Sequence, residues 1–514
     1  MWKKIDEQPL KGWYIFAAFI PVFIISALYF SPWQTHAIYG DDLYIYDIFN
    51  RSGDAAIINI SQKYRPINNV LIRILIRIFN KNLPLYYYFN VLVQAAVVVV
   101  FIKIAHLVTR SITLSFISGI IIALSRFNLY NVTQLYNGGA LEGLAMIPFL
   151  CCLLYLLRTL VDSPLSPSIS FRAMLWSLFF ANMAIYIHER YIVLFPVIAL
   201  CTLMPQFRET SVNRRIMIIV LAILSIAVNY AIKKYIFHIS FFMGTGNVDI
   251  SFSPSSSYTY LKDGLCSILG INSGPEYLVG YTFSSLSFTY QLLVYTSLTL
   301  AAFFFGGGLI RMFVTQSIDA DRKKTIAVLF VLLVLFIVCL IPAIITIRLE
   351  QRWLQASMAV YVLMLLVAIN CLFPKNTMLK IGALSIVAIL SITVNHNYLK
   401  NGANNIYLCN AHNKAVLVKQ AIETGIIKEE CTTLAIYEKK KDINNENEIN
   451  WIVQNGLFFE FYGQRKKEIV FVDSTDKTKN IGSSPIDITK TQIIYITHNV
   501  VDITDKYMSN YFTY

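Results

Sequence analysis

Long apolar runs alternate with short polar segments over the first 395 residues of the chain. The runs that are nearly free of charge are residues 12–30, 88–108, 111–125, 139–160, 172–187, 190–205, 216–233, 288–313, 324–346, 354–373 and 378–394. A helix needs about 20 predominantly apolar residues to cross a bilayer, and most of these runs approach that length. The pattern therefore predicts an all-α polytopic membrane protein with about eleven transmembrane helices.

The pattern changes after residue 395. Asn, Lys, Asp, Glu and Thr become common, and the apolar runs shorten to strand length in TTLAIYE, KEIVFVD and TQIIYIT. Helical or loop segments such as 414–423 separate these three predicted strands. We therefore expect two domains, a transmembrane domain over residues 1–395 and a small α/β domain over residues 396–514. An odd number of spans places the second domain on the side opposite the N-terminus.

Composition agrees with a membrane protein and excludes an ordinary soluble enzyme. Hydrophobic residues make up 56% of the chain and charged residues 14%, whereas a soluble domain carries about 25% charged residues. The net charge of +13 comes mainly from Lys and Arg in short loops beside the apolar runs. That distribution is typical of the positive-inside rule and of contact with anionic membrane lipid. We expect no nucleic-acid partner.

The charges in the loops also predict the orientation. With the N-terminus in the cytoplasm, the cytoplasmic loops carry Arg110, Arg158, Arg172, Arg208, Arg214, Arg215, Arg311, Arg322, Lys323, Lys324, Lys375 and Lys380. The short loops on the other side hold fewer cations, as the rule requires. The first run follows a basic start and has no small-residue cleavage site after it, which predicts a retained helix rather than a signal peptide.

The cysteines indicate no metal site. Five of the eight lie in apolar runs, where Cys behaves as a small hydrophobic residue, and none has the spacing of metal ligands. Cys409 and Cys431 lie in the C-terminal region. Whether they form a disulfide is an open question if that side of the membrane is oxidising.

The loop over residues 31–87 is an exception because it is rich in Arg and Lys. Within it, the sequence INNVLIRILIRIFN places Asn69, Arg73, Arg77 and Asn80 on a narrow stripe at helical spacing. This predicts a helix lying in the membrane interface with its arginines reaching the headgroups. The helix is either a simple anchor, or Arg73 or Arg77 faces the phosphate of a lipid-linked substrate.

Ionisable residues gather on the predicted outer face, after the first run, at the ends of the fourth and fifth runs, and between the ninth and tenth. They are Asp41, Asp42, Arg65, Glu142, His188, Glu189, Arg190, Arg348, Glu350 and Arg352. Such groups are costly beside a membrane span and tend to mark functional sites. Structural roles are the alternative: a helix cap at 41–42, an ion-paired turn at 188–190, a salt-bridged lip at 348–352, and a hydrogen-bonded carboxylate at Glu142.

These residue types suit the transfer of a group from a lipid phosphate to a hydroxyl acceptor. A surface aspartate can accept the proton of the attacking hydroxyl as general base. Arginines can hold the phosphate leaving group and stabilise its developing charge. Apolar grooves between helices can hold a polyprenyl tail.

The GDD segment at 40–42, the YRP segment at 64–66 and the HERY turn at 188–191 resemble the GT-C superfamily of polyprenyl-phosphate-sugar-dependent glycosyltransferases. The resemblance covers residues 1–395. Size, helix count and the small C-terminal region are most similar to bacterial O-antigen-modifying, serotype-converting glucosyltransferases. This implies a bacterial inner-membrane hexosyltransferase with a periplasmic C-terminal domain. It would move glucose from an undecaprenyl-phosphate-type lipid donor to a hydroxyl of a cell-surface glycan such as the O-antigen of lipopolysaccharide.

The resemblance also implies roles for the candidate residues. Asp41 matches the catalytic base, although the Asp-Asp pair replaces the Asp-Glu pair of the mannosyltransferases and leaves the base between two neighbours. Asp42 would orient the acceptor or assist a metal, and Glu189 would support the acceptor. The candidate substrate-binding residues are Arg65, Arg73, Arg77, Glu142, His188, Arg190, Arg348, Glu350 and Arg352, of which Arg348 and Arg352 best match the phosphate positions. No His, Asp or Glu grouping has clear metal-ligand spacing, so a requirement for a divalent metal stays open.

Other functional classes compete with this interpretation. A flippase for lipid-linked sugars would carry polar groups at mid-membrane and repeated halves, whereas the spans here are nearly free of charge. An O-antigen polymerase or ligase would use the same face and similar donors, but an acidic pair directly after the first span favours the GT-C class. A non-catalytic membrane protein follows if every polar cluster is an ordinary interface feature.

Reporter fusions test the predicted topology. We expect reporters placed after residues 110 and 215 to read as cytoplasmic and a reporter after residue 400 to read as extracytoplasmic. Paired phosphatase and fluorescent-protein fusions measure both states. A cytoplasmic signal after residue 400 would contradict the odd number of spans.

Overall fold

In the computed structural model, the described part of the chain covers residues 12–52, 64–161, 167–204, 207, 210–239, 253–314, 320–345, 349–438, 442–473, 480–481, 484–485 and 490–505. Arg348 is the one predicted site residue that lies outside these ranges.

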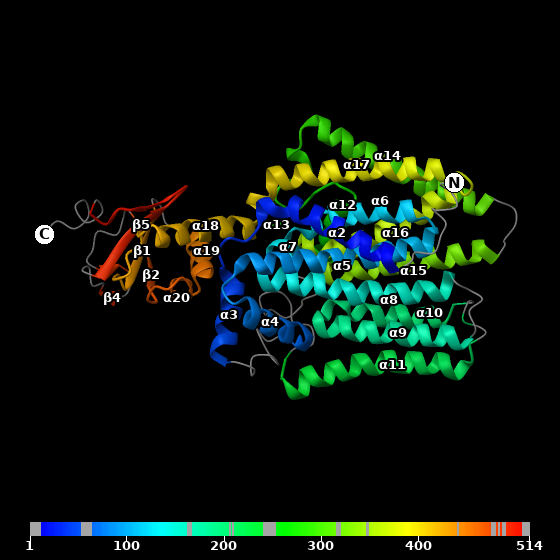
Figure 1. The fold of residues 1–514 in the computed structure, drawn as a ribbon, viewed down its shortest axis with the longest axis horizontal. Coiled ribbons are helices and arrows are strands. Elements are labelled where there is room, and N and C mark those ends of the chain that lie inside the picture. The colour runs from blue at the N-terminus through cyan, green and yellow to red at the C-terminus, as the bar shows by residue number, and fades with distance from the viewer. Residues whose placement is uncertain are drawn as a thin grey trace.

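A bundle of long helices makes up most of the molecule (Figure 1). These helices are α2 (Gly12–Phe30), α5 (Leu83–Thr109), α8 (Leu144–Val161), α9 (Pro167–Ile187), α11 (Val212–Ala231), α14 (Phe288–Val314), α15 (Ala320–Ile344), α16 (Gln355–Leu372) and α17 (Thr377–Gly402). Within the described ranges, nine helices are long and apolar enough to cross a membrane. The count is ten if α6 (Ile112–Ala123) and the helical residues Arg126–Thr133, which bend by 55°, form one broken span. The polytopic all-α class is confirmed.

The described helices give fewer spans than the eleven apolar runs, and prolines account for one difference. The run over residues 190–205 yields a short 3-10 turn, Glu189–Val193, followed by α10 (Leu194–Thr202), which has nine residues. A helix rises about 1.5 Å per residue, so α10 by itself is too short to cross a bilayer. Pro196 lies in its first turn and Pro205 follows it in the sequence, and proline disfavours helix before itself. The prediction of a span over residues 190–205 counted apolar residues only and did not consider these two prolines.

Short helices cover the end of the bundle where α2 finishes (Figure 1). They are α3 (Gly40–Ser52), α4 (Pro66–Phe79), α7 (Leu129–Thr133), the π-helix η4 (Leu135–Gly143), α12 (Pro254–Ile268) and α13 (Glu276–Val279). The helix α4 falls on the predicted INNVLIRILIRIFN segment. Its exposed apolar residues Val70, Ile74 and Ile78 recur every fourth position, which presents one apolar stripe, the surface that an interfacial helix offers to lipid.

The C-terminal region forms a small α/β unit at the same end (Figure 1). Its sheet has the order β2-β1-β5-β6, in which β1 (Thr433–Glu438), β2 (Glu468–Asp473) and β5 (Thr491–Ile496) are parallel and β6 (Val500–Asp502) is antiparallel to β5. The three predicted strands are β1, β2 and β5. A two-residue pair, β3 (Asn480–Ile481) and β4 (Ser484–Pro485), and the helices α18 (Tyr407–Glu423), α19 (Ile443–Val453) and α20 (Leu457–Phe461) complete the unit. The expected small α/β region is therefore present.

The C-terminal unit and the end of the bundle share one hydrophobic core. Buried residues from the bundle side, such as Phe49 and Tyr86, belong to the same cluster as Phe458 and Ile494 from the C-terminal unit. Helix α3 lies between the two parts (Figure 1). Because this apolar contact continues across both parts, the short helices at the end of the bundle are held against α18, α19 and α20.

One glycine permits the closest approach between the two parts. Gly40 begins α3 with a φ of +56°, a left-handed conformation that favours glycine. A Cβ at this position would also lie 2.5 Å from the indole ring of Trp451 on α19. Gly40 therefore sets both the direction in which α3 starts and the position of the acidic pair that follows it.

Candidate active site

The two neighbouring aspartates of α3 have different surroundings. Asp42 is buried, and its two carboxylate oxygens accept hydrogen bonds of 3.1 Å each from the backbone N–H groups of Leu135 and Tyr136. These groups open η4, and the first N–H groups of a helix lack partners within it. A carboxylate also interacts favourably with the positive end of the helix dipole. Asp42 therefore acts as a cap, but for a helix remote in sequence rather than for its own.

Asp41 faces solvent instead. Its Oδ1 accepts a hydrogen bond of 2.9 Å from the indole Nε1–H of Trp451. The C-terminal unit thus contacts the residue that the sequence marked as catalytic base. An exposed carboxylate held by one neutral donor can still receive a proton from a bound hydroxyl.

Glu142 is the centre of a buried ionic cluster. One of its oxygens, Oε1, lies 2.9 Å from Arg190 Nη2, 3.4 Å from His188 Nε2 and 4.0 Å from Arg352 Nε. Arg352 Nε also lies 2.6 Å from the carboxylate of Glu350, which is fully buried. Two polar segments far apart in the sequence, at 188–190 and 350–352, therefore meet around the Glu142 carboxylate.

A second ion pair joins this cluster from the long first loop. Arg65 donates two hydrogen bonds to Glu189, from Nε at 2.7 Å and from Nη2 at 2.6 Å. His188 lies between the two pairs, with Nδ1 3.7 Å from Glu189 Oε2. Lys233, in the π-helical turn η7 (Ile232–Ile236) that follows α11, adds a further positive charge near Glu189. We call the set Arg65, Glu142, His188, Glu189, Arg190, Lys233, Glu350 and Arg352 the ionic cluster.

Burial and charge together decide the protonation states in the HERY turn. Burial lowers the pKa of His188 to about 4, with the nearby Arg190 adding to the shift. The ring is therefore neutral near pH 7, and its Nδ1 accepts the backbone N–H of Arg190 at 3.4 Å, which leaves Nε2–H to point at Glu142. Burial opposes ionisation of Glu189, but Arg65 foremost holds its pKa well below the usual value.

Three consecutive residues connect the acidic pair with the ionic cluster. Gln134 Oε1 accepts a hydrogen bond of 3.3 Å from Arg352 Nη1, and the next two residues donate their backbone N–H groups to Asp42. Arg352 also lies over the ring of Tyr130, 5.6 Å from its centroid, a distance that allows a cation–π contact. Asp42 and Arg352 are therefore both held at the start of η4, Asp42 by backbone N–H groups and Arg352 by the side chain of Gln134.

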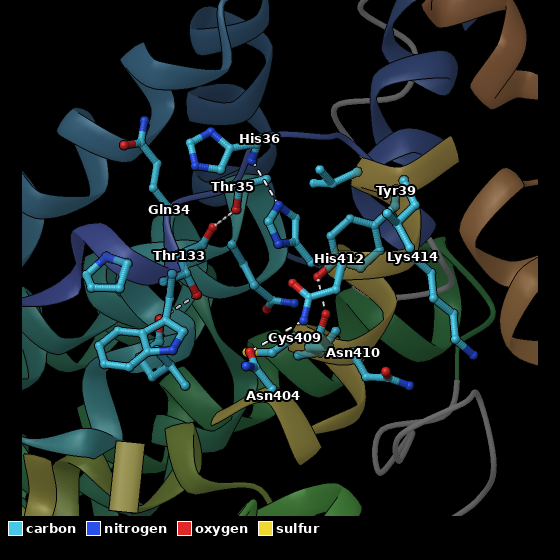
Figure 2. Close-up of a pocket in the computed structure, with 18 of the residues that line it drawn as sticks. Gln34, Thr35, His36, Tyr39, Thr133, Asn404, Cys409, Asn410, His412 and Lys414 are labelled. Atoms are coloured by element: carbon cyan, nitrogen blue, oxygen red, sulfur yellow. Dashed lines mark hydrogen bonds between the residues drawn. The ribbon is translucent and has the colours of Figure 1, made fainter. Parts of the chain in front are cut away.

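Next to this junction is a cavity of about 690 Å³ between the bundle and the C-terminal unit. It is lined by the loop after α2, by α7 and by α18, and Figure 2 shows His36, Tyr39 and His412 among its wall residues. Sequence reasoning missed His36 and His412. These two residues lie 376 positions apart, so their spacing along the chain did not mark them.

Two predicted arginines do not belong to the ionic cluster as the described contacts define it. Arg73 donates a 2.6 Å hydrogen bond from Nη1 to the carbonyl oxygen of Phe49, so it ties α4 to α3. Arg77 is exposed on α4. Asn69, on the same predicted stripe, is buried. That the arginines of α4 reach the headgroups stays a prediction.

Cys409 and Cys431 are free thiols and form no disulfide. Over the described ranges, no three His, Cys, Asp or Glu side chains come together as metal ligands.

Replacing the central carboxylate should destabilise the protein strongly. The variant Glu142→Gln leaves buried guanidinium charge without its partner, which typically costs about 3–5 kcal/mol. Thermal unfolding in detergent measures the loss, with exposed Glu429→Gln as matched control. Equal melting temperatures for the two variants would show that Glu142 does not hold the cluster together.

The neutral state of His188 should make stability fall in acid. Its folded pKa of about 4 lies below the unfolded value of about 6.5, so the unfolded chain binds the extra proton between these values. This group should contribute a loss of about 2 kcal/mol between pH 7 and pH 5. His188→Asn, which cannot titrate, should lose correspondingly less when unfolding is followed at both pH values. Identical pH dependence in both proteins would contradict the assignment.

No family model matches the sequence, and no curated protein matches it. Several solved structures resemble the fold at low identity, including the following three. AglB, the oligosaccharyltransferase of Archaeoglobus fulgidus in complex with an inhibitory peptide and a dolichol-phosphate, is 12% identical with a TM-score of 0.42, over 87% of this chain and 64% of that one. The apo Archaeoglobus fulgidus oligosaccharyltransferase is 12% identical with a TM-score of 0.43, over 93% and 62%. ArnT from Cupriavidus metallidurans, bound to undecaprenyl phosphate, is 11% identical with a TM-score of 0.46, over 97% and 94%. This chain spans less than two thirds of the length of both oligosaccharyltransferase chains.

Proposed function

We propose that this chain is a membrane glycosyltransferase that moves a sugar from a polyprenyl-phosphate donor to a hydroxyl of a glycan acceptor. One observation carries the proposal: the acidic pair of α3 and the ionic cluster meet at residues 134–136, beside a cavity at the end of the helix bundle. An exposed base, a basic phosphate site and a space for the acceptor are the parts that this reaction needs.

Asp41 is the proposed general base. Asp42 is committed to two backbone N–H groups, whereas Asp41 faces solvent. In the proposed step, the acceptor hydroxyl gives its proton to the Asp41 carboxylate as its oxygen bonds to the anomeric carbon of the sugar. The bond between that carbon and the phosphate oxygen breaks, and polyprenyl phosphate leaves with the electron pair.

The ionic cluster is the proposed site for the phosphate. It holds four cationic side chains against three carboxylates, with His188 neutral, so it retains positive charge. The side chains of Arg65, Arg190 and Arg352 are 11%, 13% and 15% exposed, so a small part of each side chain is accessible. A guanidinium can bind a phosphate through two parallel hydrogen bonds. Arg348 stays a proposed further phosphate contact from its place in the sequence.

The lipid tail is proposed to lie along the apolar surface beside the ionic cluster. Helix α4 exposes Val70, Ile74 and Ile78, and Arg77 is exposed on the last turn of the same helix. An arginine at the end of an apolar stripe can reach the headgroup region. Glucose as the sugar, O-antigen as the acceptor and the periplasmic face of a bacterial inner membrane are supported by the sequence resemblance.

The place of the charges favours an enzyme over a transporter of lipid-linked sugars. The ionic cluster draws on the ends of helices and on turns, at Arg65, the HERY turn and residues 350–352. Transporters usually place their substrate site near the bilayer midplane. A site at the edge of the bundle instead suits a donor whose phosphate lies among the headgroups.

The variant Asp41→Asn should abolish sugar transfer without affecting folding. Loss of a general base lowers the rate by about 10²–10⁴-fold, and Asp41 is exposed, so the fold does not depend on its charge. The initial rate of transfer from a radiolabelled polyprenyl-phosphate sugar in membrane vesicles measures this. Asp47→Asn, on the same helix, is the matched control and should keep its activity. An Asp41→Asn rate near that of the control would show that Asp41 is not the base.

A further inference from the structure

The cavity beside the acidic pair has walls from both parts of the molecule. The bundle contributes the loop after α2 and the residues around Gln134, and the C-terminal unit contributes α18 and the turn at Thr497 and His498. Figure 2 shows Gln34, Asn404 and Asn410 among the side chains drawn around the cavity. At about 690 Å³ the cavity falls within the range of about 300–1,000 Å³ of small-molecule sites.

The walls of this cavity are polar but almost free of charge. Among the described residues that line it, Lys414 is the one Lys or Arg, and none is Asp or Glu. Lys414 is already paired with the carboxylate of Glu448 and donates to Asn445 Oδ1 at 2.8 Å. Burial, with His36 nearby, lowers the pKa of His412 to about 4, so this ring is neutral near pH 7. The cavity therefore offers little to an anionic ligand.

The groups that do line the cavity match a sugar. Gln34, Asn404 and Asn413 present primary amides, which both donate and accept hydrogen bonds, as sugar hydroxyls do. Trp33 and Tyr39 add aromatic surface, which packs against the apolar face of a pyranose ring. Amides and aromatic rings around one cavity suit a neutral, hydroxyl-rich ligand better than they suit a lipid or a phosphate.

The residues around the cavity indicate which substrate it would hold, the acceptor or the donor. Arg352 lies behind Gln134 and Tyr130, so the cations that would hold the donor phosphate are on the other side of the cavity wall. On the side of the base, the ring of Tyr39 packs edge-to-face on Trp451 at 5.7 Å, and Trp451 donates to Asp41. The wall residue Tyr39 is thus connected through Trp451 to the proposed base, whereas Gln134 and Tyr130 lie between the cavity and Arg352.

We propose that this cavity binds a neutral saccharide, the segment of the acceptor glycan next to the hydroxyl that receives the sugar. The C-terminal unit then acts in acceptor recognition, since α18 forms one of the walls. This inference rests on the proposed glycosyltransferase function, which supplies the reason for a saccharide to bind there.

Saturation-transfer difference NMR on the full-length protein in detergent tests the inference without any donor. The probes are neutral hexose and deoxyhexose trisaccharides, with inorganic phosphate and glucose 1-phosphate as anionic comparators. We expect saturation transfer to a neutral trisaccharide and no competition by phosphate. Trp33→Ala should weaken binding at least fivefold. Trp176→Ala, which removes a half-exposed tryptophan of α9 that does not line the cavity, should not change it.

The outcomes separate this inference from the proposed function. Asp41→Asn should bind the trisaccharide as the wild type does while losing transfer, because Asp41 is not among the residues that line the cavity. Binding of no neutral probe, binding of the anionic comparators in preference, or equal affinity in Trp33→Ala and wild type would each overturn the saccharide site. Failure of wild-type protein to transfer sugar while it binds the trisaccharide would instead count against the glycosyltransferase function.

Discussion

The structure at the end of the bundle depends on the pairing of buried charge around Glu142. Removing a charge from water costs several kcal/mol, so a carboxylate beside a membrane span needs cationic partners within a few ångströms. Arg190 and Arg352 meet that need from two other segments of the chain. By doing so they fix the positions of the HERY turn and of the residues that precede α16. The same cations are the ones that a phosphate could use, so one arrangement serves stability and the proposed chemistry.

Much of this arrangement follows from simple features of the sequence. Runs of about 20 apolar residues predict spanning helices, because backbone polar groups in lipid must be satisfied within the helix. The run that contains Pro196 falls short of that rule, because it yields only the nine-residue helix α10. Charges excluded from the spans collect at their ends, so the gathering of Asp41, Glu189 and Arg352 at one end of the bundle could be anticipated. The three C-terminal strands were visible as short apolar runs.

The partners within the site could not be predicted. Sequence gives no reason why Arg65 should pair with Glu189 across 124 positions rather than with a neighbour. The two groups that bind Asp42 are backbone N–H groups, which every residue except proline carries, so no side chain marked them. The cavity was hidden for a related reason. Its walls come from remote segments and hold mostly polar and aromatic residues, which the packing of the C-terminal unit on the bundle brings together.

The proposed base, the proposed phosphate site and the proposed acceptor cavity thus lie together at one end of the helix bundle. The activity proposed for them is the transfer of a sugar. The most direct test is to express the chain in a bacterium with a defined lipopolysaccharide and measure the mass of the extracted glycan. The account predicts an increment equal to one sugar residue on the glycan that depends on Asp41. An unchanged glycan mass, with the protein present and folded in the membrane, would contradict it.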